Sequence, residues 1–168
     1  LDAVAAAGAA GIRNVIVLTP GFGETGDAAD AERELRLREI CATHGIAMCG
    51  PNCLGIMNFV DRCFPVAHDL TGALGEIATG PVAIVSQSGG VLISLLAGLM
   101  HRHIGLSHVV SSGSELNVGV HDYLDWLAED PTTGAVGLIV EGLNDGSAFL
   151  SAATRALAGG KPLVVMKL

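Results

Sequence analysis

Aromatic side chains and positive charges are both scarce in this sequence. Aromatic residues make up 4% of the 168 positions, and 9 Lys and Arg stand against 17 Asp and Glu, for a formal net charge of −8. This charge argues against a nucleic-acid surface or an anionic membrane surface. No apolar stretch reaches the roughly 18 residues that suggest a membrane-spanning helix. We therefore expect neither nucleic acid nor membrane as a partner.

Cysteine is present but lacks a metal-binding pattern. Cys49 and Cys53 are four positions apart, with no second pair and no histidine doublet nearby, so we expect no metal site. Reduced thiols of a cytoplasmic protein are the better interpretation. The six histidines also lack ligand spacing, and we expect solvated or capping roles for all of them. The chain starts without Met and without a basic n-region, as expected for a piece of a longer protein.

Half of the residues are hydrophobic, mostly Ala, Val and Leu with many Gly, which suits parallel strands covered by helices of small residues. Apolar β-type runs alternate with helical patterns, which indicates an α/β fold with a parallel sheet. In the helix over 28–44, Leu35 and Ile40 are expected to face inward, with Leu37 as a further candidate. Residues 58–80 show no clear periodicity and are read as an inter-domain connection, either irregular or with short strands. Strands are expected at 15–18, 46–49, 82–85, 107–110, 136–140 and 163–166, and helices at 1–10, 28–44, 91–102, 120–128 and 147–157.

The stretch 81–96, PVAIVSQSGGVLISLL, holds the clearest local signal. A buried strand ends in a Ser/Gly turn that opens directly into a helix. The first N–H groups of that helix lack intrahelical acceptors, and together with the helix dipole they favour an anion. This pattern predicts that a phosphate or phosphoryl group meets Ser88, Gly89 and Gly90. An ordinary connection with Ser88 as N-cap remains an alternative.

Two further motifs are weaker. Residues 21–26, GFGETG, match G-x-G-x-x-G, but the next strand ends at Cys49 without the carboxylate that a dinucleotide site needs. Ser88 sits where a hydrolase nucleophile would, yet no Asp lies between it and His121, and no His follows His121. We therefore expect neither an NAD-dependent oxidoreductase nor a serine hydrolase.

Glu141 ends an apolar strand at the edge where ligands of open parallel sheets gather. Its carboxylate could orient a cationic or imidazole partner, or it could be a loop carboxylate that faces water. Both interpretations stay open from the residues alone.

Several loop motifs together resemble the NDP-forming acyl-CoA synthetases, the superfamily that includes the succinyl-CoA ligase α subunit. The similarity is closest to the branch of ADP-forming acetate–CoA ligase and feruloyl-CoA synthetase. The motifs occur in the family's order and cover nearly the whole chain: GPNCLG at 50–55, PVAIVSQSGG at 81–90, SSGSE at 111–115, DYLDWLAEDPTT at 122–133, LIVEGLNDGSAF at 138–149 and KPLVVMKL at 161–168.

The resemblance implies the domain organisation and the reaction. Residues 1–60 would be the last part of a Rossmann-like CoA-binding domain, 61–77 a connection, and 78–168 an incomplete flavodoxin-like succinyl-CoA synthetase domain. Such enzymes join an acid to CoA with ATP, through an acyl phosphate and a phosphohistidine. CoA or acyl-CoA and phosphate would meet this chain, whereas ATP or ADP and Mg²⁺ would need an ATP-grasp domain or subunit.

The resemblance also assigns roles to residues. Ser88, Gly89 and Gly90 would hold phosphate, Glu141 would support a phosphohistidine, and Asn52 and Cys53 would lie near the CoA thiol. None of the six histidines matches the phosphorylated one, so the chain alone is expected to be inactive.

One position departs from the family pattern, because Ser114 stands where family members usually have Asn. A non-catalytic CoA-sensing module of a multidomain protein, such as an acetyltransferase, is the alternative function. A homo-oligomer is possible if a sheet edge is exposed.

Overall fold

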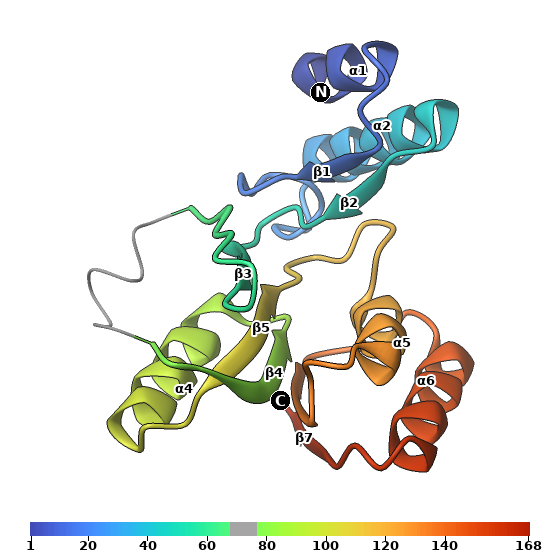
Figure 1. The fold of residues 1–168 in the computed structure, drawn as a ribbon. Helices are drawn as coiled ribbons and strands as arrows, with labels where there is room; N and C mark the ends of the chain where they lie inside the picture. Colours follow the sequence, from blue (N-terminus) through green and yellow to red (C-terminus); the bar gives the residue numbers. More distant parts are fainter. Residues whose placement is uncertain (68–76) are drawn as a thin grey trace.

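The computed structural model describes residues 1–67 and 77–168, which form two α/β units, each built on its own sheet (Figure 1). The first unit holds a two-stranded parallel sheet whose strands pair Asn14 with Ala47 through Ile16 with Cys49. Its elements are α1 (Asp2–Ala9), β1 (Asn14–Ile16), α2 (Ala28–His44) and β2 (Ala47–Cys49).

Helix α2 buries a narrow stripe made of Asp30, Leu37 and Cys41. These residues are seven and four positions apart, so they share one helical face. The expectation that Leu35 faces inward is wrong, because its side chain is 63% exposed. Ile40 packs at the margin of the same core, as Val15 of β1 does. The two-stranded sheet is small, so α2 can bury only a narrow face against it, and that face is the stripe through Leu37.

The second unit is a five-stranded sheet in the order β3-β5-β4-β6-β7, parallel except for β3. The expected alternation of four strands with three helices is confirmed in this unit. Its elements are β3 (Gly55–Asn58), β4 (Thr79–Ser86), α4 (Gly89–His101), β5 (Leu106–Ser111), α5 (Val120–Glu129), β6 (Ala135–Val140), α6 (Gly146–Ala158) and β7 (Leu163–Lys167).

Strand β3 was not expected from the sequence. Four residues are too short for a clear alternation, although Met57 is fully buried. It runs antiparallel to β5, with Gly55 opposite Ser111, so the sheets divide the chain between Cys49 and Gly55, ahead of the boundary expected near residue 60. Within the expected connection over 61–77, Cys63 bridges to Asn58, and residues 68–76 lie outside the described part.

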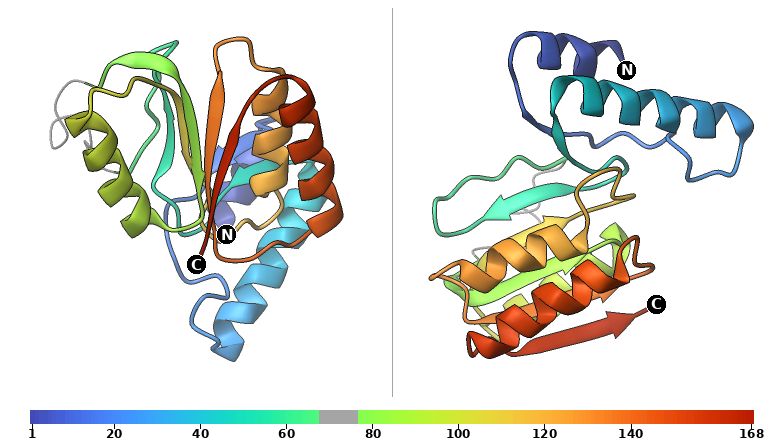
Figure 2. Two further views of the ribbon diagram at one scale, coloured as in Figure 1. Left: turned by 90° about the horizontal axis from the view of Figure 1, so that it is seen from below. Right: turned by 90° about the vertical axis from the view of Figure 1, so that its right-hand side faces the viewer.

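The helices cover both faces of this sheet, with α4 on one face and α5 and α6 packed together on the other (Figures 1 and 2). Successive side chains of β4 alternate between the two cores, since Ala83 and Val85 join the α5–α6 side and Ile84 joins the α4 side. Leu92 and Leu96 anchor α4 and are fully buried. Burial on both faces explains why the strands read as continuous apolar runs.

The strand order creates a switch point between β4 and β6. These neighbouring parallel strands lead into helices on opposite faces, α4 and α6 (Figure 2). Ligands of open α/β sheets bind outside the carboxyl ends of the strands at such a point. In the described part of the chain, no helix is long and apolar enough to cross a membrane.

Candidate functional site

A cleft of about 660 Å³ opens at the carboxyl ends of the strands, against loops of the first unit. All six residues assigned from the sequence line it, together with others that the sequence did not single out. The assigned residues are Asn52, Cys53, Ser88, Gly89, Gly90 and Glu141, and the additional polar residues are Glu24, Gln87, Ser111 and Ser114.

The N-terminus of α4 forms one wall of this cleft. Ser88 is the N-cap, and its Oγ accepts a hydrogen bond from the Val91 N–H at 3.4 Å. The Ser86 hydroxyl donates to the Ser88 carbonyl at 2.8 Å, which fixes the turn. The first turn contains no acidic residue, and a Cβ added at Gly90 would meet no atom within 4 Å. The helix therefore presents open space and a positive dipole end to the cleft.

Asn52 and Cys53 come from the loop between β2 and β3. Asn52 is exposed and has a positive φ of 54°, whereas Cys53 is 5% exposed and its thiol donates to the Val17 carbonyl at 3.4 Å. The neighbouring Cys49 side chain lowers the pKa of Cys53, whereas Cys53 together with burial raises the pKa of Cys49. The more acidic thiol of the pair is thus the one that lines the cleft.

Glu141 directly follows β6 and is exposed. Its backbone N–H donates to Gln87 Oε1 at 2.5 Å, and its carbonyl accepts a hydrogen bond from Lys167 Nζ at 2.8 Å. The Gln87 amide also bonds both backbone groups of Gly142, at 3.0 Å and 2.9 Å. The backbone that carries the Glu141 carboxylate is therefore held on both sides.

Glu24 brings a second carboxylate to the cleft from the loop between β1 and α2. Its Oε2 accepts the N–H groups of Gly21 and Phe22 at 2.9 Å and 2.8 Å, and its Oε1 accepts the Ser114 hydroxyl at 3.3 Å. Partial burial acts to raise the pKa of Glu24, but these hydrogen bonds outweigh it and lower the pKa below its usual value. The glycine-rich motif over 21–26 thus binds its own carboxylate.

Glu115 lies behind the cleft and was also missed. It is 3% exposed, its Oε1 accepts the Ser112 hydroxyl at 2.7 Å, and its Oε2 has no partner in the described part of the chain. Burial raises its pKa by more than the nearby polar groups, with the Ser112 hydroxyl first among them, lower it. Its motif gave no sign of this burial, because a Glu in a Ser/Gly turn is usually solvated.

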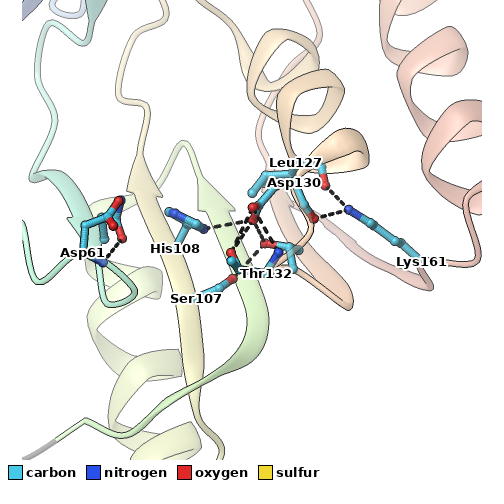
Figure 3. Close-up of polar contacts among 9 residues, drawn as sticks. Asp61, Ser107, His108, Leu127, Asp130, Thr132 and Lys161 are labelled. Atoms are coloured by element: carbon cyan, nitrogen blue, oxygen red, sulfur yellow. Dashed lines mark hydrogen bonds and ion pairs between the residues drawn. The ribbon is translucent and has the colours of Figure 1, made fainter.

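A second polar cluster lies away from the cleft, around His108 and the end of α5 (Figure 3). His108 is 6% exposed, its Nδ1 lies 3.4 Å from Asp130 Oδ2, and its ring packs on Trp126 edge to face. The expectation that all six histidines are solvated or capping is wrong for His108, because every residue of β5 is buried. Burial lowers its pKa, and Asp130 and Asp61 offset only part of this effect.

Lys161 holds the other side of the same cluster. Its Nζ donates to the carbonyls of Leu127 at 2.7 Å and Asp130 at 2.6 Å (Figure 3). These carbonyls belong to the end of α5, where a cation suits the helix dipole. The cluster fastens α5 to the sheet and contributes no residue to the cleft.

Comparisons with known proteins agree with this architecture. The family model described as "Succinyl-CoA ligase like flavodoxin domain" matches residues 79–168. A trans-feruloyl-CoA synthase from an unknown prokaryotic organism is 36% identical over 99% of this chain. An ADP-forming acetate–CoA ligase I of Archaeoglobus fulgidus is 34% identical over 98% of it.

A solved structure of acetyl-coenzyme A synthetase 1 from Ca. Korarchaeum cryptofilum, in complex with phosphate and ADP, superposes with a TM-score of 0.88 at 30% identity. It matches 99% of this chain, which covers 34% of that one. The chain spans 23% of the length of each of the two sequence relatives. Because the family model matches more than half of its residues, the chain belongs to the family of succinyl-CoA ligase-like flavodoxin domains.

Proposed function

We propose that this chain is part of an NDP-forming acyl-CoA synthetase, in which it supplies the phosphate-binding side and the CoA-thiol side of the site. The complete enzyme would convert acid, CoA and ATP to acyl-CoA, ADP and phosphate. The observation that carries the proposal is the single cleft that unites Ser88, Gly89 and Gly90 with Glu141 and the loop at Asn52. The relative solved with phosphate and ADP supports it.

Phosphate would be held at the N-terminus of α4 by backbone amides rather than by side-chain cations. Within the described residues no Lys or Arg lines the cleft, whereas Glu24 and Glu141 do. A helix N-terminus stabilises an anion by about 0.3–1 kcal/mol at an exposed site and up to about 2 kcal/mol when partly buried. We therefore expect weak binding of free phosphate, which suits a phosphoryl group that is transferred onward during the reaction.

Glu141 would support the phosphohistidine that carries the phosphoryl group, a residue that this chain does not supply. Asn52 and Cys53 would contact the thiol end of CoA. The described residues contain no cluster of three or more His, Cys, Asp or Glu that could hold a metal. We assign ATP, ADP and Mg²⁺ to an ATP-grasp domain or subunit of the complete protein, working in the cytoplasm.

A non-catalytic CoA-sensing module is the second candidate. The two carboxylates in the cleft favour it, because they oppose a phosphate anion while leaving the Cys53 side free for a thiol. A sensor of this kind would bind CoA at the Asn52 loop and would not bind phosphate at α4.

Titration of inorganic phosphate into the chain, followed by amide NMR, tests the proposal. We expect millimolar binding that shifts the amides of Gly89 and Gly90 and weakens at least about tenfold in Gly90→Val, whose side chain would fill the open space. Gly98→Val is the matched control, since Gly98 is in the same helix and its Cβ position is also open. Equal binding by both variants would refute the phosphate site, and CoA binding without phosphate binding would support the sensor.

A further inference from the structure

We propose that Gln87 is a positioning residue whose side-chain amide sets where the Glu141 carboxylate stands relative to the N-terminus of α4. The inference rests on the proposed function, because it takes α4 as the anion site and Glu141 as the acidic partner. Nothing in the sequence pattern singled out this glutamine beyond its place in the Ser/Gly turn.

The Gln87 amide matches the backbone of the turn after β6 group for group. Its Oε1 accepts the N–H groups of Glu141 at 2.5 Å and Gly142 at 3.0 Å, and its Nε2 donates to the Gly142 carbonyl at 2.9 Å. One planar amide thus uses both its acceptor and its donor on two consecutive residues. Such a contact fixes the orientation of the turn as well as its distance.

Gln87 also belongs to the opposite wall of the cleft. It immediately precedes the N-cap Ser88, and its own N–H donates to the Ile139 carbonyl at 3.0 Å. The ladder between β4 and β6 ends at the pair of Ser86 and Ile139. The Gln87 side chain therefore continues the cross-strand bonding by one step, at the point where the two strands part.

The Gln87 bonds lie at the switch point, where the two neighbouring chains diverge. After β4 the chain enters α4 on one face, and after β6 it leads to α6 on the other face (Figure 2). In the described part of the chain, no other hydrogen bond joins residues 87–90 to residues 141–145. Glu141 is exposed, and among the described residues the one other hydrogen bond to its own backbone is the bond from Lys167 to its carbonyl.

A double-mutant cycle with inorganic phosphate as the probe separates positioning from plain stability. Glu141→Gln removes a like charge, and in the wild-type background we expect it to tighten phosphate binding about threefold. In the Gln87→Leu background the carboxylate is no longer held near α4, and the same change should matter by less than about 1.5-fold. Equal factors in both backgrounds would overturn the inference.

Amide hydrogen exchange gives a second readout that needs no ligand. Gln87→Leu should speed exchange at Glu141 and Gly142 by at least about tenfold, whereas Gln87→Glu, which keeps the acceptor oxygen, should retain most of the protection. Unchanged exchange at these two amides in Gln87→Leu would also overturn the inference. If the wild-type chain binds no phosphate, the proposed anion site fails, while the exchange result still decides the role of Gln87.

Asn117→Leu is the matched control for both experiments. The Asn117 amide likewise bridges two backbone groups, accepting the Met48 N–H at 3.0 Å and donating to the Ile46 carbonyl at 2.7 Å. It joins the first unit to the segment before α5 and does not line the cleft. We expect it to lower stability without changing the phosphate cycle or the exchange at Glu141.

Discussion

Two strand–loop–helix segments, β1 to α2 and β4 to α4, differ in whether acidic side chains occupy the N-terminus of the helix. In the loop before α2, the Glu24 carboxylate accepts hydrogen bonds from the N–H groups of Gly21 and Phe22. Asp27 is the N-cap of α2, and Asp30 lies in its first turn. In the loop before α4, the N-cap is the neutral Ser88, and the first turn has no acid.

A glycine pattern alone therefore does not make an anion site. Both loops provide free amides and a helix N-terminus, which are the physical requirements for binding phosphate. In the loop before α2, the chain's own carboxylates already accept hydrogen bonds from these amides. Those carboxylates would repel a further anion there. The loop before α4 leaves its amides to a ligand, and Gly90 leaves the space open.

The largest expected effect is a loss of stability from a substitution in the core of the first unit. Leu37 is fully buried against the two-stranded sheet, so Leu37→Ala should lower the free energy of unfolding by about 2–5 kcal/mol. Leu35→Ala, two positions away on an exposed side chain, should change it by less than about 0.5 kcal/mol. Urea denaturation of both variants measures the difference, and similar losses would contradict the assigned face of α2.

A single substitution should make the loop before α4 behave like the loop before α2. Gly90→Asp places an acid in the first turn of α4, where it suits the helix dipole but repels phosphate. Phosphate affinity should fall at least about tenfold, which is about 1.4 kcal/mol. The melting temperature should hold or rise, because Gly is a poor helix former. Retained phosphate binding would show that the anion does not use this helix end.

Removal of the N-cap side chain should destabilise α2 more than α4. Asp27 accepts the Ala29 N–H at 3.1 Å and carries a charge, whereas Ser88 accepts the Val91 N–H at a longer 3.4 Å. Asp27→Ala should therefore cost about 1 kcal/mol, and Ser88→Ala less. Thermal unfolding of the two variants gives the order, and the reverse order would mean that the charge on Asp27 contributes little.

The smallest expected effect is a difference in acid sensitivity between the loops. The folded-state pKa of Glu24 lies below its unfolded value of 4.5, so the unfolded chain binds more protons in this range. The stabilisation is complete above pH 4.5 and is lost as the pH falls through the folded pKa. Amide shifts of Gly21 and Phe22 should move in that window, and Glu24→Gln should abolish the movement. An unchanged titration in the variant would assign it to another group.

The local pattern of apolar residues in the sequence was enough to predict much of the fold. The alternation in residues 79–168 followed from apolar β-type runs and helical spacing, since both periods are properties of the chain itself. The antiparallel β3 did not follow, because four residues carry no readable period and its pairing with β5 is a long-range contact. The burial of His108 was hidden for the same reason: burial of β5 on both faces depends on what packs against it.

The sequence by itself determined which residues end the strands and which helix end carries no acid. The carboxyl ends of parallel strands meet at one edge, so Ser88, Gly90 and Glu141 were bound to gather there. Only the tertiary structure decided that Glu24 is folded back onto its own loop and that the Gln87 amide bridges the two walls of the cleft. The Gln87 contacts join residues up to 55 positions apart, and their hydrogen-bond geometry exists only after the strands have paired.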